Sequence, residues 1–491
     1  MAVLAHACCG QAHGVACLCG HPRVQAGFRR LEMDIQRRMV LGGMAAAVGL
    51  YAGFGASSLL LAEAPERDPR PLLLTNLRLF DGQRLELQQG RAVLVEGDRI
   101  KDVIAPDAAP ESVRRIDCQG HVLMPGLIDA HWHSTLCGVS QVTAMTADIA
   151  YVHLVAAREA ERTLLRGFTT VRDVGGPAFA LKQAIDEGVM AGPRIFPAGA
   201  MISQTSGHGD FRLLNELPRA GDGDLSYTER AGVTAIADGA DAVLRRTREQ
   251  LMRGASQIKL MAGGGVASPY DPLDSAQFTE QELRAAVDAA SDWGTYVTVH
   301  VYTPGGIQRA IRAGARCIEH GQLADEETVR MMADHDIWWS LQPFLQDEDA
   351  NVYPDAARQA LQAEVAEGTE RAFELADKHN VRTGFGTDIL MSPGKTESQG
   401  RQLAKLTRWM EPLSVLRRAT AGNGELLALS GDRAPYGGKL GVIEPGALAD
   451  LLLVDGNPEE DLTFLDTPDT SLKLILKGGG IHANRLNGEA A

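Results

Sequence analysis

The chain has few cysteines and fewer basic than acidic residues. Only seven cysteines occur in 491 residues, and four of them lie within the first 32. The other three, Cys118, Cys137 and Cys317, are odd in number and widely spaced, so they predict neither a disulfide framework nor a Cys-x-x-Cys zinc or redox pair. The net charge of −15 argues against nucleic acid or an anionic membrane as a partner and is typical of a soluble protein.

Two common catalytic motifs are also missing. The sequence has no Gly-x-Ser-x-Gly turn of the kind that would support a serine hydrolase. The run Gly263–Gly265 lacks the Lys-Ser/Thr ending of a phosphate-binding loop, so it predicts a close backbone approach at the mouth of a site instead.

The first 64 residues differ from the rest of the chain. Residues 1–32 show no helix or strand pattern and contain no lysine. Beyond Met33, the pair Arg37-Arg38 resembles a twin-arginine motif and precedes an uncharged stretch from Met39 to Ala62. The tripeptide Ala62-Glu63-Ala64 fits the small-x-small pattern of a cleavage site.

We therefore expect residues 1–64 to comprise an upstream segment and a twin-arginine signal peptide, with Met33 as the true start. This predicts an exported, periplasmic protein with no stable membrane span after signal removal. The alternatives are an uncleaved membrane anchor and, if the signal is not used, a cytoplasmic protein.

At both ends of the remaining chain, short apolar runs alternate with turns. The pairs Asp81-Gly82 and Pro445-Gly446 mark such turns, and no long helical period appears near them. We predict that residues 65–124 and 437–491 together form one small β-sandwich. The length of the chain is consistent with a large domain joined to a smaller one.

Between these ends, residues 125–436 alternate apolar runs with helical stretches. The runs are Gly126–His131, Thr169–Asp173, Arg194–Ala198, Gln257–Met261, Tyr296–Val301, Cys317–His320, Trp338–Gln342 and Val381–Asp388, and the helical stretches include 152–166, 235–253, 280–293, 325–335 and 357–379. Eight strand–helix alternations predict an α/β fold, a closed parallel (β/α)₈ TIM barrel.

The first of these runs ends in two histidines, His131 and His133. Residues i and i+2 of a strand point the same way, so both imidazoles can bind one metal ion. A His-x-His pair alone is weak evidence, because many such pairs are surface or core histidines.

Further ligand types occur at the ends of other apolar runs: Lys259, His300, His320 and Asp388. A barrel of this type gathers its chemistry at the C-terminal ends of its strands. We therefore predict that six side chains from five strands meet at one mouth. Histidine nitrogens and a carboxylate suit Zn²⁺, although cobalt and manganese also occupy such sites.

Lys259 has two interpretations. Beside two cations and out of water, its amine is pushed towards the neutral form, which can take up CO₂ and become a carbamate that bridges two metal ions. The alternative is a lysine whose stem packs in the barrel while its amine reaches the mouth. His208, after the third run, and Tyr270, after the glycine-rich loop, are candidate substrate contacts; the alternative for each is an ordinary loop residue.

These motifs resemble the amidohydrolase superfamily, specifically its binuclear, carboxylated-lysine branch, from about Leu72 to Lys477. The residues that carry the resemblance are 125–133, Lys259, Thr298–His300, Ile318–Gly321, Gly386–Asp388 and 441–451. The segments Gly167–Asp173, Ser206–Asp210 and Gly263–Pro269 are similar to the prolidase-like (Xaa-Pro dipeptidase-like) group, which includes ochratoxin-degrading amidohydrolases.

The resemblance implies two divalent metal ions. His131, His133 and Asp388 would bind one, His300 and His320 the other, and carboxylated Lys259 would bridge them. It also implies a homo-oligomer.

The predicted activity is the metal-dependent hydrolysis of an amide bond to a C-terminal amino acid. Dipeptides, N-acyl amino acids and ochratoxin-like amides are the expected small-molecule substrates, so the protein would act as a dipeptidase, a carboxypeptidase or an N-acyl amino acid hydrolase. A metal-bridging hydroxide would attack the carbonyl, and Asp388 would pass the proton to the leaving nitrogen. In the alternative, Asp388 is only a ligand.

Two other functions compete with this one. A cyclic-amide hydrolase of the imidazolonepropionase type would use one metal and no bridging lysine, so Lys259 counts against it. A non-catalytic scaffold would be expected to have lost ligands, whereas all six are present.

Overall fold

The structure is a computed structural model that describes residues 70–486, apart from 109, 111, 219–222, 269 and 354. The predicted upstream segment and signal peptide, residues 1–64, lie outside the described residues. Within the described part of the chain, no helix is both long enough and apolar enough to cross a membrane.

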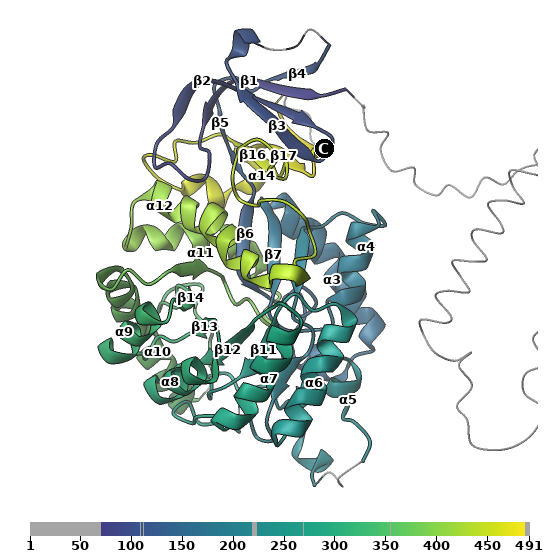
Figure 1. The fold of residues 1–491 in the computed structure, drawn as a ribbon, viewed down its shortest axis with the longest axis vertical. Helices are drawn as coiled ribbons and strands as arrows, with labels where there is room; N and C mark the ends of the chain where they lie inside the picture. The colour runs from purple at the N-terminus through teal and green to yellow at the C-terminus, as the bar shows by residue number, and fades with distance from the viewer. Residues whose placement is uncertain are drawn as a thin grey trace, which may run out of the picture. The chain divides into compact units, whose positions relative to one another are not determined.

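Strands from both ends of the described chain pair into one sheet (Figure 1). They are β1 (Leu72–Leu79), β2 (Gln88–Glu96), β3 (Arg99–Ile104), β4 (Arg114–Asp117), β5 (Val122–Pro125), β16 (Leu451–Val454), β17 (Leu472–Lys477) and β18 (Gly480–Asn484). Their order is β18-β17-β16-β5-β1-β2-β3, and β4 pairs with β1. The two chain ends are joined where β5 and β16 pair antiparallel, with Leu123 opposite Leu453.

The chain ends thus combine as expected, but the predicted sandwich of two sheets is not confirmed. Pairing of β5 with β16 makes a single mixed sheet of eight strands. Apolar residues alternate across it, as strand geometry requires: Leu74 and Val93 belong to one core cluster, whereas Leu73 and Leu94 belong to another.

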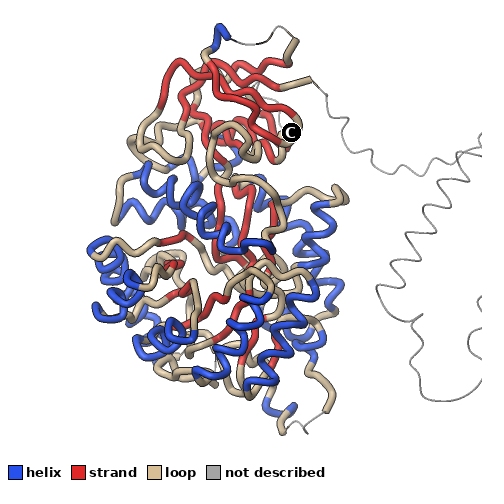
Figure 2. Tube along the Cα trace, in the orientation of Figure 1, coloured by secondary structure: helices blue, strands red, loops and turns tan. Residues whose placement is uncertain are grey.

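The middle of the chain alternates strands and helices (Figure 2). The strands are β6 (Leu127–Trp132), β7 (Phe168–Asp173), β8 (Arg194–Pro197), β9 (Met201–Ser203), β10 (Thr234–Ile236), β11 (Ile258–Met261), β12 (Val297–Val301), β13 (Cys317–His320), β14 (Trp338–Leu341) and β15 (Thr383–Phe385). Each of the eight predicted apolar runs overlaps one of them, and β9 and β10 are additional strands that the sequence pattern did not predict.

These strands form a TIM-barrel-like α/β arrangement, but the predicted closed ladder is not seen among the described strands. One parallel sheet holds β6-β7-β8, and a second has the order β10-β9-β11-β12-β13-β14-β15. The extra strand β9 pairs with β11. It thereby occupies the edge of β11 with which β8 would pair in a closed barrel. Single backbone hydrogen bonds span the two seams: Ser256 N donates to Pro197 O at 2.8 Å, and Asp388 N donates to His131 O at 2.9 Å.

The helices of the described chain follow local signals in the sequence. They are α2 (Gln141–Thr146), α3 (Ile149–Leu165), α4 (Phe179–Asp186), α5 (Tyr227–Arg230), α6 (Ala240–Arg253), α7 (Glu280–Asp292), α8 (Pro304–Ala313), α9 (Glu326–Asp334), α10 (Ala356–Lys378), α11 (Gln399–Ala404), α12 (Pro412–Arg417), α13 (Asn423–Leu427) and α14 (Pro468–Ser471). Short 3-10 turns lie at Pro106–Ala108, Leu214–Glu216, Thr396–Ser398, Lys405–Arg408, Ala428–Arg433 and Thr463–Asp466, and a π-helix spans Arg418–Gly422.

Helix α7 shows how these signals work. Thr279 caps its N-terminus and forms a capping box with Glu282. Leu283, Ala286 and Ala290 recur at helical spacing and are buried. They pack in the same core cluster as apolar residues of β11 and β12, so the helix covers the strands and leaves their C-terminal ends for the polar residues described next.

Candidate metal centre

The strand ends bring the six predicted side chains together. His131 lies in β6 and His133 directly follows it, Lys259 lies in β11, His300 in β12, and His320 ends β13. Asp388 follows β15 by three residues. The four histidines and the lysine are almost fully buried, whereas the Asp388 side chain is 21% exposed.

Asp388 lies between the two histidines of the first strand. Its Oδ1 is 3.2 Å from His131 Nε2 and 3.3 Å from His133 Nε2. His131, His320 and Asp388 each offer a ligand atom, and these atoms all lie within 4.8 Å of one another. The ring of His300 is 4.5 Å from that of His320, centroid to centroid, so all four imidazoles surround one small volume.

Local backbone geometry explains how the last strand reaches the first. A Cβ atom at Gly386 would lie 2.3 Å from His131 Cβ, so glycine is needed where β15 approaches β6. Asp388 and His320 are non-glycine residues with φ of 54° and 69°, in the left-handed region. Such strained positions cluster at functional sites.

Each histidine has one ring nitrogen engaged by a neighbouring acceptor. The contacts are His131 Nδ1 with Glu319 Oε2 at 2.8 Å, His133 Nδ1 with Gly175 O at 2.8 Å, His300 Nε2 with Gly264 O at 3.1 Å, and His320 Nδ1 with Gln342 Oε1 at 2.8 Å. Histidines that bind metal ions are held in this way, because the outer hydrogen bond fixes the ring and its tautomer. The remaining nitrogens, Nε2 of His131, His133 and His320 and Nδ1 of His300, are the candidate ligand atoms. The residues therefore fit divalent metal ions.

The protonation states also suit metal binding. Burial lowers the pKa of His300 and of His320 well below the ordinary value, so both rings are neutral. Burial raises the pKa of Asp388, but His131 and His133 lower it more, and the carboxyl is held ionised. Neutral imidazole and ionised carboxylate are the forms that bind metal, so His300, His320 and Asp388 are in the required state. For His131, burial and Lys259 lower the pKa while Asp388 and Glu319 raise it, and the net direction is upward, so a proton on this ring must be released when a metal ion binds.

Lys259 is 1% exposed, and its backbone lies opposite Thr298 in the pairing of β11 with β12. Burial lowers its pKa to about 8, although Glu319 and Asp388 oppose the shift. A larger fraction of Lys259 is therefore in the neutral amine form than for a lysine in water. Carbamate formation needs this neutral form.

A buried ion pair next to the candidate metal centre was not predicted from the sequence. Arg172 Nη2 donates to Glu319 Oε1 at 2.6 Å, and both side chains are fully buried. Arg172 also donates to Ala130 O and to the Tyr296 hydroxyl. Because Glu319 in turn accepts from His131, this pair holds a candidate ligand in place. A charged residue inside each of two apolar runs was the signal that could have found it.

Asp129 fastens the seam between β6 and the segment after β15. It is fully buried and accepts hydrogen bonds from His131 N at 3.0 Å, Thr387 N at 3.2 Å, Thr387 Oγ1 at 2.8 Å and Gln399 Nε2 at 3.0 Å. Burial raises its pKa, which these hydrogen bonds oppose. These hydrogen bonds hold β6 close to the segment after β15, although β6 and β15 are not paired in one sheet.

A cavity of about 160 Å³ opens onto Asp388 and His300. Most of its wall comes from the loop after β14, between residues 343 and 353, and from the residues after β15. Tyr302 and Phe344 give it an apolar side, and Lys395 adds a positive charge among three aspartates of the same lining. The cavity therefore has room for a small molecule with apolar and charged parts.

The two predicted substrate contacts fall in different places. His208 lines this cavity and stacks on His300, with ring centroids 3.9 Å apart, and its Nδ1 lies 2.9 Å from Asp271 Oδ2. Tyr270 is 40% exposed and is not among the residues that line the cavity, so the structure does not bring it to the site.

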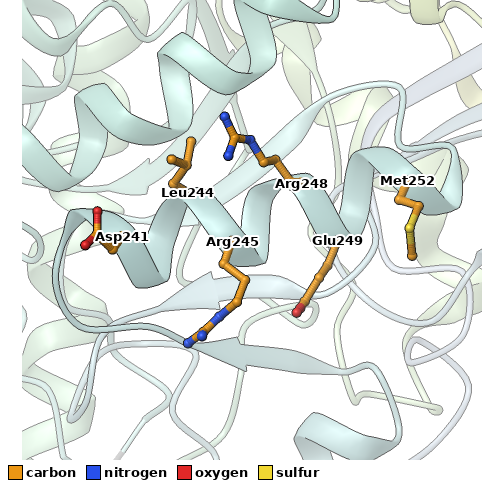
Figure 3. A pocket seen from close by; sticks show the side chains of 6 residues that line it. All are labelled: Asp241, Leu244, Arg245, Arg248, Glu249 and Met252. Atoms are coloured by element: carbon orange, nitrogen blue, oxygen red, sulfur yellow. The ribbon is translucent and has the colours of Figure 1, made fainter. Parts of the chain in front are cut away.

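A hollow of about 350 Å³ on α6 is separate from this site (Figure 3). Its lining residues, Asp241, Leu244, Arg245, Arg248, Glu249 and Met252, all come from one helix. None of them is a candidate ligand.

Residues 122–480 match the model of the Amidohydrolase family. Ochratoxinase of Aspergillus niger is 33% identical over 415 residues, which cover 81% of this chain and 83% of that protein. A solved amidohydrolase structure is 36% identical with a TM-score of 0.76, covering 85% of this chain and 100% of the other. A prolidase solved with N-methylphosphonate-L-proline is 33% identical with a TM-score of 0.75, covering 84% and 99%.

Proposed function

Because this chain belongs to the amidohydrolase family and is a hydrolase that acts on amide bonds, we propose that it cleaves the amide bond to a C-terminal amino acid. Dipeptides, N-acyl amino acids and ochratoxin-like amides are the proposed substrates. The observation that carries the proposal is the convergence of four histidines and Asp388 beside a cavity with an apolar wall and one lysine. The similarity to an ochratoxinase and to a prolidase supports it.

The proposed cofactors are two divalent metal ions, zinc in the first instance. His131, His133 and Asp388 would hold one and His300 and His320 the other, with carboxylated Lys259 between them. Bound ions of this kind polarise a carbonyl and lower the pKa of water to about 7. The proposal is supported by the donor set and by the outer hydrogen bond on each imidazole.

Asp388 has the position of a proton carrier. Its carboxylate is held ionised and reaches the cavity, where it can take a proton from the attacking water and deliver it to the leaving nitrogen. His208 lies on the same wall, with its ring fixed by Asp271, and is the proposed contact for the substrate's carbonyl or carboxylate. Glu319 and Arg172 act through His131, so they are positioning residues.

Lys395 supports the assignment of an anionic leaving group. Its Nζ donates to Asp349 O at 2.7 Å and to Asn351 Oδ1 at 2.8 Å, both neutral acceptors, and it faces the cavity. A substrate that ends in a free carboxylate would find its counter-charge there. The wall formed by Tyr302 and Phe344 favours an apolar side chain on the same substrate.

The proposal is tested with a panel of N-acyl amino acids and dipeptides, each also supplied as the C-terminal amide. The account expects hydrolysis of the free acids, loss of that hydrolysis in chelator and recovery with Zn²⁺. Activity that survives complete metal removal would overturn it. A preference for cyclic amides together with one ion per chain would favour the imidazolonepropionase type instead.

Export is a separate proposal, because the predicted signal lies outside the described residues. Expression of the whole chain and of a version with Arg37 and Arg38 changed to lysine, followed by fractionation, tests it. Periplasmic activity that depends on the arginine pair is the expected result, and equal activity in both fractions would contradict it.

A further inference from the structure

A cavity of about 490 Å³ lies at the end of the strands opposite the candidate metal centre. Trp338 begins β14 and Thr383 begins β15, and both residues line it. The rest of its wall comes from Leu85, from the C-terminal half of α10 and the segment 380–382 after it, and from residues 409–425. None of the candidate ligands or cavity residues described above contributes to it.

One wall of this cavity is flat and aromatic. Phe373 and Trp409 stack with ring centroids 4.1 Å apart and planes 14° apart. The Arg418 guanidinium lies over Phe373 at 5.7 Å, and the Arg382 guanidinium lies over Trp338 at 4.9 Å. The faces of Phe373 and Trp338 are thus covered by other groups, and the rings give the cavity an apolar aromatic wall.

Arg418 stands out among the charged residues here. Its Nη1 is buried and, among the residues that the structure describes, has no hydrogen-bond partner. Arg382 differs, because it forms an ion pair with Asp336. Burial lowers the pKa of Arg418 to about 10, opposed by Asp377, so the group stays protonated at neutral pH. Asp377 and Glu425 also line the cavity, and Asp377 acts on the charge of Arg418 without an ion pair between them in the described part of the chain.

The backbone that carries Arg418 is also unusual. Arg418–Gly422 forms a π-helix, a rare turn that often occurs at functional sites. Asn423 follows directly, and its side chain binds Ile128 O at 2.7 Å and Phe385 O at 2.8 Å. The cavity wall is therefore continuous with the residues that join β6 to β15.

We propose that this cavity binds a small organic anion with a flat apolar body, an aromatic carboxylate. The carboxylate would accept hydrogen bonds from Arg418, whose planar guanidinium can donate two in parallel. The ring would lie against Trp409 and Met410, which line the cavity and are partly exposed. The ligand would supply the hydrogen-bond acceptor that Arg418 Nη1 lacks. This binding would not depend on the metal ions or on the proposed substrate.

The test is a calorimetric titration of the whole metal-free protein with phenylacetate, and with phenylacetamide as the neutral match. We expect one saturable site for the acid and binding about tenfold weaker for the amide, the size of one charge-assisted hydrogen bond. Arg418→Met should weaken phenylacetate by a similar factor, and Arg418→Lys should lose less. Arg433→Met is the matched control, because Arg433 lies over the ring of Trp293 outside this cavity.

The outcomes separate this site from the metal centre. Binding that Arg418→Met weakens and His208→Ala leaves unchanged supports the proposal, whereas the reverse pattern places the anion at the metal centre and overturns it. Equal affinity for acid and amide, or no saturable binding, also overturns it. If Arg418→Met does not fold, as judged by its thermal midpoint, quenching of tryptophan fluorescence by the two ligands in Arg418→Lys and in the unaltered protein gives the same comparison.

Discussion

The sheet formed by the chain ends and the candidate metal centre are both buried, but they are held together differently. In the sheet, leucine and valine side chains fill the core on both faces. At the centre, the buried groups are imidazoles, Lys259, Arg172, Glu319 and Asp129, and each of them except the lysine makes hydrogen bonds within the described chain. Burial of charge is costly unless every group is paired, so its concentration at one place marks the region kept for chemistry.

The largest contrast is expected from Asp388→Asn. Loss of the proton-accepting carboxylate should lower kcat/KM by roughly 10²- to 10⁴-fold, the usual size of general acid–base catalysis. The thermal midpoint should change little, since the amide keeps the shape of the side chain. Initial rates on an N-acyl amino acid, with metal content measured on the same samples, check this. A variant with full metal occupancy and unchanged kcat would refute a catalytic role for Asp388.

Breaking the ion pair beneath the centre should cost both stability and activity. Glu319→Gln leaves the Arg172 guanidinium buried without a counter-charge, and a loss of about 3–5 kcal/mol in the free energy of unfolding is expected. Denaturant unfolding of the metal-free protein measures it. Glu326→Gln is the control, because that carboxylate pairs with Lys378 and His379 at the surface and should matter far less. Similar losses for the two variants would contradict the account.

In the sheet, the opposite pattern is expected. Leu123 is fully buried and lies opposite Leu453 where the chain ends meet. Leu123→Ala should reduce the free energy of unfolding by about 2–5 kcal/mol, from lost burial and the cavity left behind. The kcat of the folded fraction should be unchanged. A fall in kcat at full metal occupancy would show that the sheet and the centre are coupled. That result would contradict the expectation that the two regions are independent.

The smallest effect concerns substrate choice. Lys395→Met should raise KM about tenfold for substrates with a free carboxylate and leave KM for the matching amides unchanged. Lys405→Met is the matched control, because Lys405 also holds the loop after β14, through Asp347 and Asp349, without lining the cavity. An equal rise in KM for both variants would show that Lys395 only holds the loop in place and does not bind the substrate's carboxylate.

Local patterns in the sequence predicted most strands of the middle region and the candidate ligands that lie together at their ends. Apolar runs marked eight of its ten described strands, and the His131–His133 spacing placed two rings on one side of β6. Features that depend on distant pairing were not predictable: β9 takes the edge of β11, and β5 meets β16 to give one sheet. The Arg172–Glu319 contact joins residues 147 positions apart. The position of Tyr270 outside the cavity depends on the path of a loop, which has no periodic pattern in the sequence.

Metal analysis shows whether paired metal ions at the strand ends carry out the reaction. Elemental analysis of the purified protein, the His300→Ala variant and a His153→Ala control should be combined with rates before and after chelation. His153 is a suitable control because it lies in α3, where its ring contacts Ile149 O and Pro177 O, and it is not a candidate ligand. The account predicts two ions per chain in the protein and the control, fewer in His300→Ala, and rates that vanish and return with the metal. Hydrolysis that persists in protein free of metal would contradict it.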